Sequence, residues 1–152
     1  MNNPTSLSGK KILVAVTGSI AAVKAPILIS QLIKAGAKVR CVITESASKL
    51  VSPLSLSTLS RNKCYQDKDQ WRDYQSKPLH IELAEWAELI LVTPMSATSL
   101  SKFSNGNADG LLPSILLAAQ SQIVIAPAMN TSMWSNQAVR KNWNYLKTLD
   151  KV

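Results

Sequence analysis

Four short apolar segments, each followed by a turn and then by a helical pattern, constrain the fold of this chain more than any other feature. They are rich in Val and Ile and occupy residues 12–16, 39–43, 89–92 and 123–126. Continuous runs of this kind are typical of strands buried on both faces of a parallel sheet. Helical patterns lie between and after them, at 25–35, 52–59, 81–87, 97–103, 111–119 and 136–146. The alternation predicts an α/β fold: a doubly wound, open parallel sheet of the flavodoxin-like or Rossmann-like type, with helices on both faces in three layers.

The composition predicts one folded domain. The chain has 152 residues, of which 46% are apolar and 17% charged, and this is enough for one hydrophobic core. Residues 1–9 are polar and predict a mobile leader before a single domain at 10–152, while the polar stretch 61–77 predicts a surface loop or flap. Because no apolar run reaches about 18 residues and the start does not resemble a signal peptide, we expect no membrane span and a cytoplasmic location.

The charge favours an anionic partner. Lys and Arg number 17 against 9 Asp and Glu, a net charge of +8. The basic residues are scattered and do not alternate with aromatic ones, so we expect no nucleic-acid partner and favour a phosphorylated small molecule. Cys41 and Cys64 are too few for a disulfide framework and are not spaced as a metal pair, so we interpret both as structural thiols and expect no metal.

The turns after the first two predicted strands carry hydroxyls. In doubly wound sheets ligands bind beyond the carboxyl ends of the strands. The turn Thr17-Gly18-Ser19-Ile20 leads into a helix and offers N–H groups and the helix dipole to one phosphate, although it matches neither the G-x-G-x-x-G nor the Walker A pattern. The alternative is a tight turn with Ser19 as an N-cap. Thr44 or Ser46, in the second turn, could donate to the same phosphate or simply cap a helix.

The later turns carry the most specific motifs. Residues 127–134 read Pro-Ala-Met-Asn-Thr-Ser-Met-Trp, and His80 stands in Leu-His-Ile-Glu-Leu. These residues resemble the flavin-dependent cysteine decarboxylases, whose P-x-M-N-x-x-M-W motif is matched at every fixed position. The family's Pro-Ala-Ser-Ala-Asn-Thr motif is matched in part at 94–99, with Met95, Thr98 and Ser99 in place of Ala, Asn and Thr. The resemblance runs from about residue 10 to residue 150.

The resemblance implies a bound FMN, with its phosphate in the turn after the first strand and its ring against residues 94–99. At Gly106 it implies that the chain passes close to the cofactor and that a side chain would not fit. Asp109 also belongs to the family pattern, without an assignable role. The cofactor residues implied are Gly18, Ser19, Ile20, Thr44, Ser46, Pro94, Ser96, Ala97, Thr98, Ser99, Gly106 and Met129.

The implied reaction is oxidative decarboxylation of a cysteine carboxylate. The flavin oxidises the thiol to a thioaldehyde, and loss of CO2 then gives an ene-thiol. His80 corresponds to the catalytic base, and an imidazole exchanges protons near neutral pH. Asn130 corresponds to the residue that binds the substrate carboxylate through a neutral donor, and Met133 lines the same pocket. The basic charge favours 4'-phosphopantothenoylcysteine, converted to 4'-phosphopantetheine in coenzyme A biosynthesis, over a peptide ending in cysteine.

Several alternatives stay open at this point. Phosphopantothenoylcysteine decarboxylases carry a C-terminal flap with a cysteine that helps to reduce the ene-thiol, and neither Cys41 nor Cys64 lies at that place. The chain could be a fragment of a bifunctional decarboxylase and ligase, or a homologue that makes only the oxidised product. Active sites in the family lie between subunits, so we expect a homo-oligomer, a trimer or a multiple of trimers. A non-catalytic or regulatory subunit remains an alternative. Two others are disfavoured: a flavin prenyltransferase by His80 and residues 127–134, and a flavodoxin-type electron carrier by the basic charge.

Overall fold

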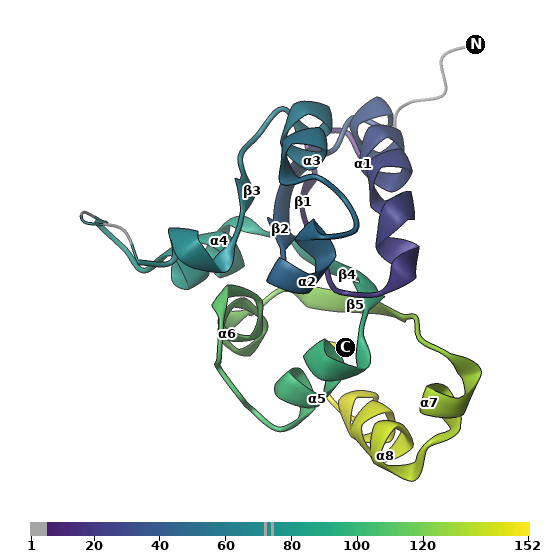
Figure 1. Ribbon diagram of the computed structural model, residues 1–152. Helices are drawn as coiled ribbons and strands as arrows, with labels where there is room; N and C mark the ends of the chain where they lie inside the picture. Colours follow the sequence, from purple (N-terminus) through teal and green to yellow (C-terminus); the bar gives the residue numbers. More distant parts are fainter. Residues whose placement is uncertain (1–5, 72, 74) are drawn as a thin grey trace.

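Five parallel strands form the centre of the molecule in the computed structural model, which describes residues 6–71, 73 and 75–152 (Figure 1). Their order across the sheet is β3-β2-β1-β4-β5, and every neighbouring pair is parallel. This arrangement confirms the doubly wound α/β fold. The strands are β1 (Lys11–Val16), β2 (Lys38–Ile43), β3 (Cys64–Tyr65), β4 (Leu89–Met95) and β5 (Gln122–Pro127).

Helices cover the sheet in two layers (Figure 1). On β1, Leu13 and Ala15 point into a core closed by α4, α5, α6 and α8, whereas Ile12, Val14 and Val16 point into a second core closed by α1 and α3. Alternate side chains of one strand are thus buried on opposite faces. The helices are η1 (Ile20–Lys24), α1 (Ala25–Lys34), α2 (Glu45–Ser48), α3 (Pro53–Ser60), η2 (Asp67–Asp69), α4 (Leu79–Trp86), α5 (Ala97–Ser104), α6 (Leu111–Ala118), α7 (Thr131–Ser135) and α8 (Gln137–Leu146).

Strand β5 departs from the prediction of strands buried on both faces. Ile123 is buried in the core beneath α5, α6 and α8, but Val124 and Ala126 on the other face are exposed. The reason is that α1 and α3, the helices of that layer, pack over β2 and over each other and not over β5. The prediction of burial on both faces is therefore wrong for this edge strand. Its first residues are partly covered by the end of the chain, where Ile123 N–H donates to the Lys151 carbonyl at 2.6 Å.

Two segments predicted to be irregular contain ordered contacts. The stretch 61–77 holds β3 and η2, and β3 pairs with β2 through Cys41 and Cys64. Two residues are too few for a periodic pattern, which is why the strand was not predicted. In the predicted leader, residues 1–5 lie outside the described residues, while the N–H groups of Leu7 and Gly9 donate to the carbonyls of Ala35 and Gly36. The described end of the leader therefore packs on the domain.

Among the described residues, no helix is both long and apolar enough to cross a bilayer.

Candidate functional site

The site is built where the strand order reverses. Strand β1 has β2 on one side and β4 on the other, so the chain leaves β1 and β4 in different directions at their carboxyl ends. A crevice opens at such a point in doubly wound sheets. The residues that follow β1 and those that end β4 form its two walls, as the sequence predicts.

Thr17, directly after β1, joins the two walls. Its side chain is completely buried, and its hydroxyl donates to the Pro94 carbonyl at 2.7 Å and accepts from the Ser96 N–H at 2.7 Å. The Thr17 backbone N–H also donates to the Pro94 carbonyl, at 3.2 Å. Pro94, predicted to bind the cofactor, is thus buried in β4, lines neither cavity described below, and connects to the turn after β1 through its carbonyl group.

The turn after β1 approaches the loop after β2 closely. A Cβ on Gly18 would lie 2.5 Å from the Cβ of Ser46, a separation that real side chains do not reach, so only glycine fits there. Within the turn, Ser19 N–H donates to the Thr17 carbonyl and Ala22 N–H to the Ser19 carbonyl. The Ser19 side chain makes no capping bond to η1. Ser19 is therefore the N-cap residue of η1 in a tight turn, as that alternative predicts, although its side chain does not take part in the capping.

The hydroxyls of the second loop have separate roles. Thr44 accepts a hydrogen bond from Ala47 N–H at 3.3 Å and is the N-cap of α2, which is the helix-cap alternative that the sequence left open. Its hydroxyl hydrogen is still available to a ligand, because capping uses only the oxygen as an acceptor. Ser46 lies in the α2 turn with its side chain exposed.

One cavity collects most of the predicted site residues. Its volume is about 580 Å³, within the range typical of small-molecule sites. The carboxamide oxygen of Asn130 accepts from Ser132 N–H at 2.8 Å and so caps α7, which leaves its NH2 group as a donor. Asn130 thus begins a helix and lines a cavity at the same time. The lining residues are Gly18, Ser19, Ile20, Ala21, Ser96, Ala97, Thr98, Ala128, Met129, Asn130 and Met133.

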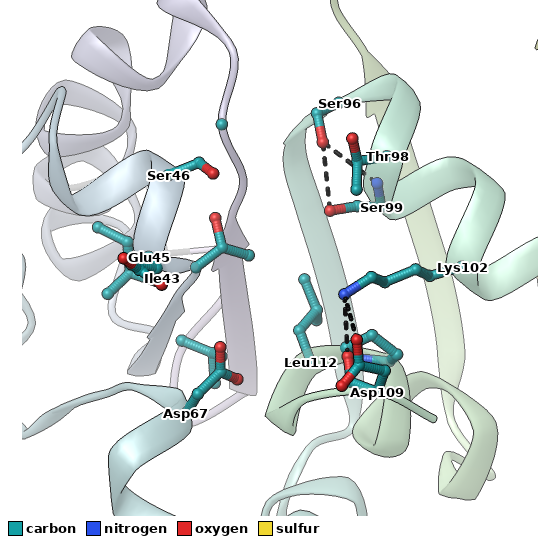
Figure 2. A pocket seen from close by; sticks show the side chains of 14 residues that line it. Ile43, Glu45, Ser46, Asp67, Ser96, Thr98, Ser99, Lys102, Asp109 and Leu112 are labelled. Atoms are coloured by element: carbon teal, nitrogen blue, oxygen red, sulfur yellow. Dashed lines mark hydrogen bonds and ion pairs between the residues drawn. The ribbon is translucent and has the colours of Figure 1, made fainter. Parts of the chain in front are cut away.

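A second cavity of about 230 Å³ shares Gly18, Ser96 and Thr98 with the first (Figure 2). We call the two together the cofactor cleft. On the α5 side, the Ser96 hydroxyl donates to the Ser99 hydroxyl at 3.2 Å and accepts from the Ser99 N–H at 3.2 Å, capping α5. On the β2 side lie Thr44 and Ser46. Hydroxyls from the loops after β2 and β4 therefore face the same cavity.

Charged side chains also line this second cavity. Of the described residues that line the cofactor cleft, Lys102 is the one cation, and its ammonium group lies 3.2 Å from a carboxylate oxygen of Asp109 and 3.1 Å from its carbonyl oxygen (Figure 2). Asp67 lies across the cavity and accepts from the Leu111 N–H at 2.7 Å, which caps α6 from outside the helix. Sequence reasoning missed Lys102 and Asp67, because nothing local to either residue marks its partner.

Gly106 is not part of the cleft. It lines neither of the two cavities, and a Cβ there would meet no protein atom within 4 Å, so no protein contact requires a glycine at this position. The backbone explains the glycine instead, because its φ of +67° lies in the left-handed region. Gly106 borders a separate apolar cavity near the start of β5, with Phe103 and Tyr145.

His80 lies apart from Asn130. It stands in the first turn of α4 and lines another cavity with Trp71, Asp73 and Gln75, none of which lines the cofactor cleft. Its Nδ1 atom is buried, and no described residue hydrogen-bonds to it. Beside it, the Trp71 side chain is 84% exposed. One copy of the chain therefore does not bring the predicted base and the predicted carboxylate-binding residue together.

Comparison with known proteins identifies relatives over almost the whole chain. The chain is 43% identical over 140 residues to the coenzyme A biosynthesis bifunctional protein CoaBC of Bacillus subtilis, covering 92% of this chain and 34% of that protein. It therefore spans about a third of the length of this relative. The fold superposes on the FMN-dependent cysteine decarboxylase SpaF with a TM-score of 0.87 and 30% identity, covering 94% of this chain and 82% of SpaF.

A second solved structure is equally informative. A mutant PPC decarboxylase complexed with pantothenoylaminoethenethiol matches with a TM-score of 0.83 and 33% identity, covering 92% of this chain and 78% of that one. These findings confirm the resemblance to flavin-dependent cysteine decarboxylases and support a flavin cofactor. The family model described as Flavoprotein matches residues 1–152, and the chain therefore belongs to the flavoprotein family.

Proposed function

We propose that this domain binds FMN in the cofactor cleft and catalyses the oxidative decarboxylation of 4'-phosphopantothenoylcysteine, on the route to 4'-phosphopantetheine in coenzyme A biosynthesis. The observation that carries the proposal is one cavity in which Asn130 and Met133 face the turn after β1 and residues 96–98. One relative is named for coenzyme A biosynthesis, and another is a PPC decarboxylase complexed with pantothenoylaminoethenethiol. Both names support 4'-phosphopantothenoylcysteine as the substrate. The net charge of +8 favours this phosphorylated substrate over a peptide.

The residues of the cleft fit FMN. The turn at Gly18 packs directly against the side chain of Ser46, with no room for a side chain at position 18. The N–H and hydroxyl groups of the two loops suit one phosphate. Ser96 and Thr98 line both cavities of the cleft, and Ala97 lines the larger one. These three residues would lie against the ring. Bound FMN would supply the two-electron oxidation of the substrate thiol.

The protein's own groups would orient the substrate and handle its protons. With its oxygen engaged by Ser132 N–H, Asn130 would present its NH2 group to the substrate carboxylate. A neutral donor orients the carboxylate without adding a charge that would stabilise it against loss of CO2. Met133, which is 47% exposed at the mouth of the cavity, would cover the apolar part of the substrate.

His80 would come from a neighbouring copy. Because it lies outside the cofactor cleft of its own chain, we propose a homo-oligomer, a trimer in keeping with the family, in which α4 of one copy faces the cleft of the next. Exposed apolar side chains beside both regions support such a contact: Ile20, Val23 and Ile27 next to the cleft, and Trp71 next to His80. His80 would then act as the base toward the substrate.

Reduction of the product is the second half of the expected reaction. Cys41 and Cys64 are buried between β2 and β3 and line neither cavity of the cleft. We therefore propose that the residues described here carry the reaction as far as CO2 release and the ene-thiol. The predicted cytoplasmic location and the absence of metal belong to the same proposal.

The first experiment measures colour and product. The purified protein should show the absorbance of an oxidised flavin, release CO2 from 4'-phosphopantothenoylcysteine and form the ene-thiol. His80→Asn should keep the colour and lose CO2 release. A colourless protein that takes up no FMN would refute the proposal. A yellow protein without CO2 release would favour a non-catalytic subunit. CO2 release from a cysteine-ending peptide alone would show that the substrate is a peptide.

A further inference from the structure

Strand β4 leaves the regular ladder before it reaches the site. Its pairing with β1 ends at Ala15 and Val92, and its register with β5 shifts between Val92 and Met95. Pro94, inside this shift, has no N–H group to donate. Met95 still pairs with Pro127 of β5, but the Pro94 carbonyl and the Ser96 N–H need partners outside the regular ladder, because buried N–H and carbonyl groups are rarely left unpaired.

Thr17 supplies those partners. Its hydroxyl is the acceptor for the Ser96 N–H and a donor to the Pro94 carbonyl, both at 2.7 Å, and its own N–H donates to the same carbonyl. A single completely buried side chain thus uses both its donor and an acceptor site across 77 and 79 residues of sequence. No other described side chain forms a hydrogen bond between the β1 turn and residues 94–96.

Both ends of this link stand at the cofactor cleft. Gly18, which follows Thr17 along the chain, and Ser96, whose N–H donates to the Thr17 hydroxyl, each line both cavities. Ser96 is also the N-cap of α5, so its place sets the start of the helix that carries Thr98 and Ser99. The distance between the turn proposed to hold the phosphate and the residues proposed to face the ring therefore depends on the Thr17 hydroxyl.

We propose that Thr17 is a positioning residue, whose buried hydroxyl holds the two walls of the cofactor cleft at the separation that FMN requires. The identity of the ligand rests on the proposed function. A ligand that bridges two walls loses affinity when their separation is no longer defined, because part of its binding free energy then goes into ordering them. Valine has the shape of threonine without the hydroxyl, and serine keeps the hydroxyl without the methyl group.

The test compares Thr17→Val and Thr17→Ser in the full chain. FMN affinity is measured by quenching of flavin fluorescence, and the asymmetry of the site by the visible circular dichroism of bound flavin. Thr17→Val leaves the Ser96 N–H without its acceptor and the Pro94 carbonyl with only the backbone N–H of residue 17 as a donor, so the FMN Kd should rise about tenfold or more, with a changed dichroic band. Thr17→Ser should stay within about threefold of the parent, since both hydrogen bonds survive.

Ser60→Ala is the matched control. Ser60 is 2% exposed and its hydroxyl donates to the carbonyls of Ser57 and Asn62, away from the cleft. Ser60→Ala should lower the free energy of unfolding and leave the FMN Kd unchanged. Hydrogen exchange in the flavin-free protein is a second readout: the Ser96 amide should be protected in the parent and in Thr17→Ser, and exposed in Thr17→Val. If Thr17→Val does not fold, Thr17→Ala takes its place.

The outcomes separate the two proposals. A parental FMN Kd in Thr17→Val, an equal loss in Thr17→Ser, or an equal loss in Ser60→Ala would each overturn the role of Thr17. Unchanged protection of Ser96 in Thr17→Val would overturn it too, whether or not flavin binds. If the parent protein binds no FMN while the Ser96 amide responds as expected, the link between the walls stands, and the assignment of the ligand fails together with the cofactor role of Thr17.

Discussion

The cofactor cleft and the residues around His80 are two parts of one proposed site, and they are built in opposite ways. The cleft is formed within one chain, with a buried threonine across its walls and with helix caps at Thr44, Ser96 and Asn130. His80 instead lies beside a solvent-exposed Trp71, and its Nδ1 atom has no partner among the described residues. In the proposed oligomer, one copy would therefore form the cofactor half of the site and its neighbour would supply the base.

The sharpest way to break this comparison is to inactivate each half in a different copy. Asn130→Asp keeps an oxygen that can cap α7 but replaces the NH2 donor with a carboxylate that repels the substrate. His80→Asn removes the base. Each variant alone should lower CO2 release by about 100-fold or more, the scale of losing a general base or one oriented donor.

Mixing the two variants then tests where the halves meet. Co-refolded or co-expressed, they should release CO2 well above either variant alone, because a contact between a copy with intact His80 and a copy with intact Asn130 restores one complete site. Two separately purified variants that do not exchange subunits are the control. A mixture no more active than its components would show that both residues act within one chain.

Gly18→Ala tests whether FMN binding depends on the close packing of the turn after β1 against Ser46. The added Cβ would lie 2.5 Å from the Cβ of Ser46, and overpacking of this kind costs about 1–3 kcal/mol. We expect a lower free energy of unfolding in urea and a much weaker FMN affinity by fluorescence titration, since the phosphate turn must move.

Gly106→Ala is the matched control for Gly18→Ala. Its φ of +67° makes alanine strained by about 1 kcal/mol or more, yet an added Cβ meets nothing within 4 Å. Stability should fall while the FMN Kd stays the same. An equal loss of FMN affinity in Gly106→Ala would return Gly106 to the cofactor site.

Asp67→Ala tests how firmly the polar segment before His80 is anchored to the cleft. Asp67 caps α6 through the Leu111 N–H at 2.7 Å, and the loss of a cap costs about 1 kcal/mol. The free energy of unfolding should fall by about that amount in Asp67→Ala and by much less in Asp67→Asn, which keeps an acceptor oxygen. Equal losses in the two variants would show that capping is not the reason.

How much of this could be predicted depends on the distance over which each feature is encoded. The four long strands, the turn after β1 and the helix cap at Thr44 are local patterns, and they were predictable. The Asp67 cap spans 44 residues and the Thr17 link 77, and neither leaves a local pattern. Gly106 shows a limit of another kind, because glycine serves either close approach or positive φ, and the residue type alone does not say which.

The smallest expected effect concerns the cysteines, which report how far β3 opens. Burial raises the pKa of the Cys41 thiol to about 11 and that of Cys64 to about 12. At pH 8 both are therefore far less ionised than free thiols, and a disulfide reagent should label them slowly in the folded protein. Because the folded-state pKa values are raised, the thiols should also lower stability as the pH rises above about 9, where the unfolded chain ionises first.

The order of labelling distinguishes local from global opening. Cys41 lies in β2 between two neighbouring strands, while Cys64 lies in the two-residue edge strand β3, at the start of the segment that leads to His80. If this segment opens independently of the cleft, Cys64 should be labelled before Cys41, and added FMN should slow Cys41 more than Cys64. Mass spectrometry of the labelled peptides, with Cys64→Ser and Cys41→Ser as references, measures both rates. Equal rates that track the free energy of unfolding would show that β3 opens only with the whole domain, and the two halves of the site would then be equally rigid.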